Sequence, residues 1–381
     1  TAKAIPLPVE ALNRAKSAQA YASNFNDPLL KDQWNLINNA PFEGKSVIGA
    51  DVQIEEAWKL NTGDPSIIVA VLDEGIDVNH PDLKDNMWQN EGEIYGSTED
   101  NDNNGYIGDR HGYNFIADCG VISADDVYDT GHGTHVAGVI AAVNNNGIGI
   151  SSVAGGNGNQ SGVKIMSCQI FSGNLAGTVL AEVQAIKYAA DNGAVILQCS
   201  WGYISGSANP FEWGPQYSTD EEWKSSNPIE VAALDYFVNN AGSPNGVING
   251  GIAIFASGNE SAPSASYPAA YPEFVSVAAT AADYTPASYT NYGPGTTISA
   301  PGGDQDYYYE YGEGFSRGAV GCILSTVPTN VSESGYAFFE GTSMACPHVS
   351  GIVALALSYA NQLRKQFTPD EIKSILYETA T

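Results

Sequence analysis

The stretch Ile67-Ile68-Val69-Ala70-Val71-Leu72, followed by Asp73, decides the fold class of this chain. Six consecutive apolar residues, most of them β-branched, are typical of a strand buried on both faces of a parallel sheet. The aspartate then falls at the carboxyl end of the strand, which is the edge where open α/β sheets bind their ligands. We therefore expect Asp73 to belong to the functional site.

Further apolar runs alternate along the chain with segments of helical periodicity. Strands are predicted over residues 163–171, 195–199 and 251–256, and helices over 132–142, 178–192, 229–239, 343–360 and 369–378. Alternating strands and helices imply a mainly parallel, doubly wound sheet with helices on both faces. The expected fold class is thus α/β, with three α/β/α layers.

Composition narrows the classes of partner. The 381 residues carry a net charge of −28, and 43% of them are hydrophobic. Such acidity argues against nucleic acids and anionic membrane surfaces, because their phosphate groups would repel the chain. No apolar run approaches the roughly 18–20 residues of a membrane span. We expect neither nucleic acid nor a membrane span.

The five cysteines have neither CxxC pairing nor the spacing of a zinc site. They are Cys119, Cys168, Cys199, Cys322 and Cys346. Cys168 and Cys199 lie in apolar runs, so we expect them to be buried free thiols. A disulfide between Cys119 and Cys322 is the alternative.

Three short motifs contain an aspartate, a histidine and a serine, in that order. The motifs are Val71-Leu72-Asp73-Glu74-Gly75, Gly131-His132-Gly133-Thr134-His135 and Gly341-Thr342-Ser343-Met344-Ala345. A serine hydroxyl becomes nucleophilic when a histidine takes its proton, and a buried carboxylate orients that histidine. Ser343 also opens a predicted helix, whose N-terminus favours developing negative charge. A zinc site at His132 and His135 is excluded because no third ligand accompanies them.

The three motifs in this order resemble the signature of the subtilisin-like serine proteases, the subtilases. Matching sequence runs from about Asn26 to the C-terminus. The resemblance implies a broadly specific serine endopeptidase that works through an acyl-enzyme, with Asp73, His132 and Ser343 as its triad. It also implies a peptidase domain over residues 26–381, preceded by an N-terminal arm over 1–25. Insertions are expected near 203–227 and 302–318, as loops near the cleft.

The same resemblance assigns further residues of the site. Ile254-Phe255-Ala256-Ser257-Gly258-Asn259 is similar to the family segment whose asparagine stabilises the oxyanion, so Asn259 takes that role beside the Ser343 backbone N–H. The segment Ser200-Trp201-Gly202 resembles the one that pairs with the substrate backbone as an added strand. Ser266 matches the residue near the base of the primary specificity pocket. Because Ser266 is uncharged, that pocket has no counter-ion for a basic residue.

Glu74 departs from the Ser or Thr that most secreted members have after the catalytic aspartate. An acidic residue there resembles the kexin-like branch of the family. We expect an exposed carboxylate at the rim of the cleft, with a mild, salt-sensitive preference for Lys or Arg one residue before the primary substrate position. The alternative is a solvated surface charge.

Calcium is the implied cofactor. Asp100-Asn101-Asp102-Asn103-Asn104-Gly105 fits the first half of an EF-hand-like loop, so Asp100, Asp102 and Asn104 are candidate ligands and Asp109 is a substitute for the missing terminal glutamate. A polar surface turn is the alternative. A second calcium site follows from the family resemblance alone. Its candidate ligands are Asp27, Asp82, Asn146, Ile148 and Ile150.

The expected partners are protein or peptide substrates and a prodomain, which subtilases commonly carry and remove. A monomer is expected. The resemblance implies an extracellular, periplasmic or cell-surface location, with the signal segment already removed from this chain. Two alternatives remain: a catalytically silent subtilase fold that binds peptides, and a precursor-processing protease with a basic preference.

Overall fold

The computed structural model describes residues 3–17, 25–94, 97–173, 175–212, 214–312 and 314–380. Within these residues, a central sheet has the strand order β11-β10-β9-β6-β2-β4-β3, and β5 pairs with β4 at one side. Every pair is parallel except β4–β5. The strands are β2 (Ile68–Glu74), β3 (Gly112–Asn114), β4 (Lys164–Ser172), β5 (Leu175–Ala176), β6 (Ile196–Cys199), β9 (Ile252–Ala256), β10 (Val275–Thr280) and β11 (Ile298–Pro301).

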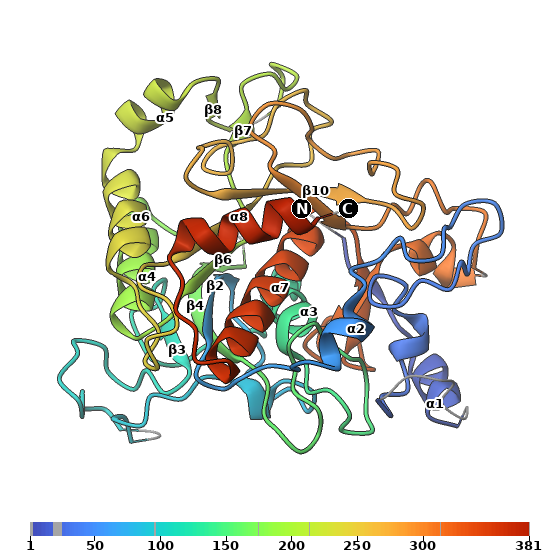
Figure 1. The fold of residues 1–381 in the computed structure, drawn as a ribbon, viewed down its shortest axis with the longest axis horizontal. Coiled ribbons are helices and arrows are strands. Elements are labelled where there is room, and N and C mark those ends of the chain that lie inside the picture. The colour runs from blue at the N-terminus through green and yellow to red at the C-terminus, as the bar shows by residue number, and fades with distance from the viewer. Residues whose placement is uncertain are drawn as a thin grey trace.

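Helices cover both faces of this sheet, as Figure 1 shows. On one face lie α4 (Val179–Asp191) and α6 (Pro228–Asn240), and on the other lie α3 (His132–Ala141) and α7 (Thr342–Gln362). Alternate residues of β2 divide between the two cores: Ile68, Ala70 and Leu72 pack with α4 and α6, whereas Val69 and Val71 pack with α3 and α7. The predicted three-layer α/β/α fold is confirmed.

Helix α7 forms the centre of one core. It is the one helix of the described residues that is long and apolar enough to cross a membrane, but 83% of its most apolar window is buried inside the protein. Its length and hydropathy are those of a core helix, which needs apolar residues on all sides when it is enclosed. Helix α8 (Pro369–Thr379) follows; its Ile372 belongs to the same hydrophobic core, and Leu376 packs against that core.

The N-terminal arm is built into the fold. Strand β1 (Ile5–Pro6) pairs antiparallel with β13 (Tyr336–Phe339), which also pairs with β12 (Ile323–Thr326). Helix α1 (Val9–Ser17) lies within the predicted N-terminal arm, and residues 18–24 lie outside the described residues. The remaining elements are α2 (Ile54–Trp58), β7 (Ile204–Ser205), β8 (Gln216–Tyr217), α5 (Asp220–Ser226), and 3-10 helices over Leu30–Asp32, Lys84–Asn86, Gly314–Ser316 and Ala319–Gly321.

The two predicted insertions have different surroundings. Residues 203–227 contain β7, β8 and α5 and lie against the segment around Ser266, because Tyr203 N donates to Tyr267 O at 2.8 Å and the fully buried Trp223 stacks on Tyr267. Residues 302–318 are anchored by Tyr308, whose buried ring packs on Phe42. This insertion is therefore fixed in the core at Tyr308.

All five cysteines are free thiols, so the alternative disulfide between Cys119 and Cys322 does not form. Cys346 is a buried residue near the start of α7, and burial raises the pKa of its thiol to about 12. A thiol with such a pKa stays protonated at neutral pH and is a poor nucleophile.

Candidate active site

Asp73 and His132 form the first half of the site. Asp73 is the sixth residue of β2 and is 2% exposed, and His132 is the first residue of α3. The imidazole Nδ1 lies 2.8 Å from Asp73 Oδ1 and 2.9 Å from Oδ2. Burial by itself lowers the pKa of His132, but the charges of Asp73 and Glu74 outweigh it and raise that pKa above its ordinary value. The carboxylate thus fixes the ring with Nδ1 as donor and Nε2 as the free base.

Ser343 lies in the first turn of α7, next to the carboxyl end of β6. Its hydroxyl donates to the Ser200 carbonyl oxygen at 3.2 Å, and the Ser200 hydroxyl donates back to Ser343 O at 2.7 Å. Ser200 directly follows β6, which lies next to β2 in the sheet. The carboxyl ends of adjacent parallel strands therefore bring the serine motif to the same edge as Asp73.

Asn259 and Gly341 shape the space beside Ser343. The Asn259 side chain accepts, through Oδ1, from Thr342 N at 2.9 Å and from Thr342 Oγ1 at 2.8 Å, which leaves its Nδ2 as the outward donor. A Cβ placed on Gly341 would lie 3.5 Å from Ser343 N and 3.8 Å from Asn259 Nδ2. Both N–H donors thus border one small space that glycine leaves empty. This is the arrangement needed to stabilise an oxyanion.

Glu74 is not the exposed rim residue that the sequence suggests. Its side chain is half-buried and turned to the start of α3, where it accepts from His132 N at 3.0 Å and from Thr130 N at 3.1 Å. Desolvation raises the pKa of this carboxyl, and the charge of Asp73 raises it further. A shift in the register of β2 against β4 between Asp73 and Glu74 lets consecutive side chains face the same helix.

The predicted substrate-binding residues lie next to this site. Trp201 packs edge-on against Phe255, and its Nε1 donates to Leu72 O at 2.9 Å. A Cβ on Gly202 would come within 3.2 Å of Ser266 Oγ. The structure therefore places Gly202 opposite the buried Ser266, and their binding roles stay predictions.

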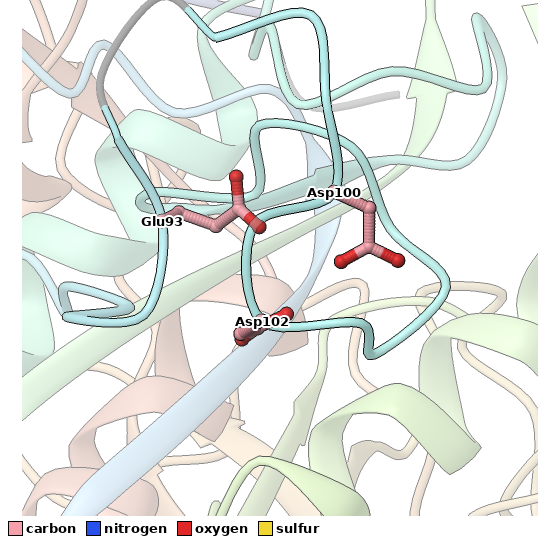
Figure 2. A group of neighbouring side chains, drawn as sticks. All are labelled: Glu93, Asp100 and Asp102. Carbon is pink, nitrogen blue, oxygen red and sulfur yellow. The ribbon is translucent and has the colours of Figure 1, made fainter.

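Three carboxylates converge in the loop that the sequence proposes for calcium. Glu93, Asp100 and Asp102, called the loop cluster below, each offer an oxygen within 4.8 Å of the others. Figure 2 shows the Glu93 side chain reaching across the loop toward the two aspartates. Sequence reasoning missed Glu93, because it precedes the EF-hand-like pattern and joins it only when the chain folds back.

Asp109 and Asn104 lie beside the loop cluster, where they are hydrogen-bonded to each other. The Asp109 carboxylate accepts from Tyr188 OH at 2.7 Å, from Asn104 Nδ2 at 2.9 Å and from Asn90 Nδ2 at 2.9 Å. Its oxygens are therefore engaged by neutral donors. Neutral donors also engage Asp100 and Asp102, and of the four ligands predicted here these two are the ones that belong to the loop cluster.

The second predicted calcium position, called the latch below, joins Asp27 and Asp82 through the loop 145–151. Asp27 accepts from Asn145 N at 2.8 Å and from Asn146 N at 3.0 Å. Asp82 accepts from Asn146 Nδ2 at 2.7 Å and from Ile150 N at 3.0 Å. Asn146 Oδ1 in turn accepts from Ile148 N at 3.0 Å. In this arrangement the loop offers N–H groups to the two carboxylates.

The charge of the latch nevertheless suits a cation. Asp27 and Asp82 are both buried, and desolvation raises the pKa of each, that of Asp82 to about 7. The charge of Asp27 contributes to the raised pKa of Asp82. Among the described residues, no ion pair joins a basic side chain to either carboxyl. Two buried carboxyls without a basic partner are stabilised by a bound divalent cation.

Comparison with known proteins agrees with this geometry. Residues 64–381 match the model of the subtilase family. The chain is 28% identical over 375 residues to an extracellular basic protease of Dichelobacter nodosus, covering 93% of this chain and 52% of that protein. It is also 28% identical over 323 residues to thermitase of Thermoactinomyces vulgaris, covering 84% and 85%.

A solved protease structure from Pseudoalteromonas arctica superimposes with a TM-score of 0.60 at 26% identity, over 94% of this chain and 93% of that one. The chain spans about half the length of several of its curated relatives, including an extracellular protease of Xanthomonas campestris. The family match, by contrast, covers most of the chain. This protein belongs to the subtilase family.

Proposed function

We propose that this protein is a serine endopeptidase that cleaves peptide bonds of proteins through an acyl-enzyme. The observation that carries the proposal is the Asp73–His132 hydrogen bond at the edge of the sheet where Ser343 opens α7. Ser343 is the nucleophile, His132 the general base and then acid, and Asp73 the carboxylate that orients His132. Asn259 stabilises the oxyanion together with the Ser343 backbone N–H.

Each step of the reaction uses one of these positions. Ser343 Oγ attacks the carbonyl carbon while His132 Nε2 takes its proton. The negative charge that develops on the carbonyl oxygen enters the space beside Gly341, between Asn259 Nδ2 and Ser343 N. The imidazolium then gives its proton to the leaving amine as the C–N bond breaks. Water, deprotonated by His132, releases the acid product and restores the serine.

We infer that the substrate binds at the same carboxyl edge of the sheet. Ser200, Trp201 and Gly202 pair with an extended substrate, so that main-chain hydrogen bonds supply much of the affinity and side-chain preference stays broad. The uncharged Ser266 favours a neutral primary residue. The partners are protein substrates and a prodomain, and the protein acts as a monomer. The location is extracellular, periplasmic or on the cell surface; several relatives are named as extracellular proteases.

A fluorophosphonate probe tests this proposal directly. We expect stoichiometric labelling of the folded protein, with the adduct on Ser343 in a peptide digest, because only an activated serine reacts with such a probe. Heat-unfolded protein should remain unlabelled under the same conditions. Folded protein that does not react would support the alternative of a catalytically silent, peptide-binding fold.

We also propose that the loop cluster and the latch each bind a calcium ion. Glu93, Asp100 and Asp102 would hold the first ion with carboxylate oxygens, the ligands that calcium prefers. Asp27 and Asp82 would hold the second, after the loop N–H groups turn away from them. Calcium at these positions would supply stability, and it takes no part in the cleavage steps.

Chelation should therefore destabilise the protein. An ion that binds only the folded chain adds about 2.7 kcal/mol at 100 times its dissociation constant, so EDTA should lower Tm and speed autolysis. Calorimetric titration should find one ion fewer in Glu93→Gln and one fewer in Asp82→Asn, whereas Glu55→Gln, an exposed glutamate on α2, should bind as wild type does. A Tm that is the same in EDTA and in calcium would contradict both sites.

A further inference from the structure

We propose that Glu74 is a positioning residue for His132: its carboxylate caps helix α3 and so fixes the backbone from which the imidazole projects. This inference rests on the catalytic role of His132 proposed above. It replaces the expected role of Glu74 in substrate selection. The contacts of α3, the end of β2 and the charges around the imidazole each support it.

The first turn of α3 lacks a cap of its own. Its N-cap residue is Gly131, which has a φ of +79° and no side chain to accept from the helix. The first N–H groups of a helix have no partner within the helix. Glu74 supplies the acceptor from the neighbouring strand, because its Oε2 lies 3.0 Å from His132 N. The same carboxylate accepts from Thr130 N and from Thr130 Oγ1, both at 3.1 Å.

Two consecutive carboxylates therefore bind the same histidine, one at its ring and the other at its backbone. Asp73 binds the ring at Nδ1, and Glu74 binds the backbone at N. Successive side chains of a regular strand point to opposite faces, but the register shift between these two residues lets both reach α3. Asp73 Oδ1 also accepts from Glu74 N at 2.7 Å, which fixes the Asp73 carboxylate against the Glu74 backbone.

Close packing leaves α3 little freedom to adjust. A Cβ on Gly133, the second residue of the helix, would lie 2.2 Å from Glu74 O and 3.3 Å from Asp73 Cβ. The helix therefore rests directly on the end of β2. Small movements of Glu74 are transmitted to the imidazole, and catalytic groups lose rate steeply when they are misplaced by about 1 Å.

Charge gives Glu74 a second effect on the same residue. The titratable groups that act on His132 or Glu74 include Asp73 on β2, Asp129 in the loop before α3, and His135 on α3 itself. Asp73 and Glu74 raise the pKa of His132. Removing the charge of Glu74 lowers that pKa, so His132 stays unprotonated to lower pH and the acid limb of the kcat/KM profile moves to lower pH.

The test compares Glu74→Gln, which keeps the shape of the side chain, with Thr130→Val and with the exposed control Glu55→Gln. Substrates are two peptides that differ only in Lys or Ala one residue before the primary position. Glu74→Gln removes the charge and one of the two acceptor oxygens, so we expect it to weaken the cap and to lower kcat about tenfold on both peptides with KM unchanged. Thr130→Val should lower kcat less, and Glu55→Gln should match wild type.

Two further readouts separate positioning from other roles. In Glu74→Gln the acid limb should move to lower pH, and the imidazole resonances of His132, followed by NMR, should titrate at lower pH. A loss confined to the Lys peptide, with an unchanged pH profile, would overturn the proposal and return Glu74 to substrate selection. Unchanged rates on both peptides would also overturn it.

The NMR titration distinguishes this inference from the proposed function. If the wild-type chain fails to react with a fluorophosphonate and yet the His132 titration moves in Glu74→Gln, the proposed function fails and the hold of Glu74 on His132 stands. If the probe reacts with wild type and the titration of His132 is the same in both chains, the positioning role fails and the peptidase stands.

Discussion

Ser343→Ala and His132→Ala should each lower kcat by about 10⁶-fold, the size of the corresponding single losses in subtilisin. Without His132 the hydroxyl keeps its proton, and without Ser343 no acyl-enzyme can form. Because the triad acts as a unit, the double variant should be hardly worse than either single one. Peptide turnover, measured on protein freed of traces of wild type by a fluorophosphonate wash, gives the comparison.

The fold should survive both substitutions. Ser343→Ala removes a hydrogen bond of 3.2 Å to the Ser200 carbonyl, which contributes about 1 kcal/mol. Ser358→Ala is a matched control, because it removes a buried hydroxyl that donates to Ala354 O at 2.8 Å in the same helix. It should lose similar stability and keep full activity. Activity above a few per cent in Ser343→Ala would show that the nucleophile lies elsewhere.

Asn259→Ala should lower kcat by about 10²–10³-fold while KM changes little. The oxyanion develops only as the transition state forms, so the hydrogen bond from Asn259 Nδ2 does not contribute to substrate binding. The loss is smaller than for the triad because the Ser343 N–H remains.

Asn259 also anchors α7 through Thr342, so a control must separate the two roles. Thr342→Val removes the hydroxyl that donates to Asn259 Oδ1 and keeps Asn259 Nδ2, the proposed oxyanion donor. It should cost much less rate than Asn259→Ala. Equal losses in both variants would mean that Asn259 acts by holding the start of α7, and the oxyanion role would then be wrong.

Local patterns were enough to predict most of the layered fold. The buried strand before Asp73 and the helices 178–192 and 343–360 each carry their signal in one short window, and they lie within one or two residues of β2, α4 and α7. Strands β10 and β11 were missed, since their small residues, such as Ala278 and Ala279, become strand-like only when paired. The pairing of β1 with β13 joins opposite ends of the chain and leaves no local pattern.

The same division applies to the site. The sequence could show the three motifs, since each is a contiguous block with a chemical reason for its residues. It could not show the direction of Glu74, which depends on a register shift between neighbouring strands. Nor could it show that Glu93 joins Asp100 and Asp102, because chain reversal brings these residues together.

The pairing of Ile5 with Phe338 has a consequence for biosynthesis. The strand that pairs with β1 is also the strand that leads into Ser343, so this corner of the protein closes only after residue 339 has left the ribosome. Contacts between such distant residues form slowly, because the loop between them must first be closed. A nascent chain thus holds its aspartate and histidine long before its serine, and its triad stays incomplete until residue 343 has been made.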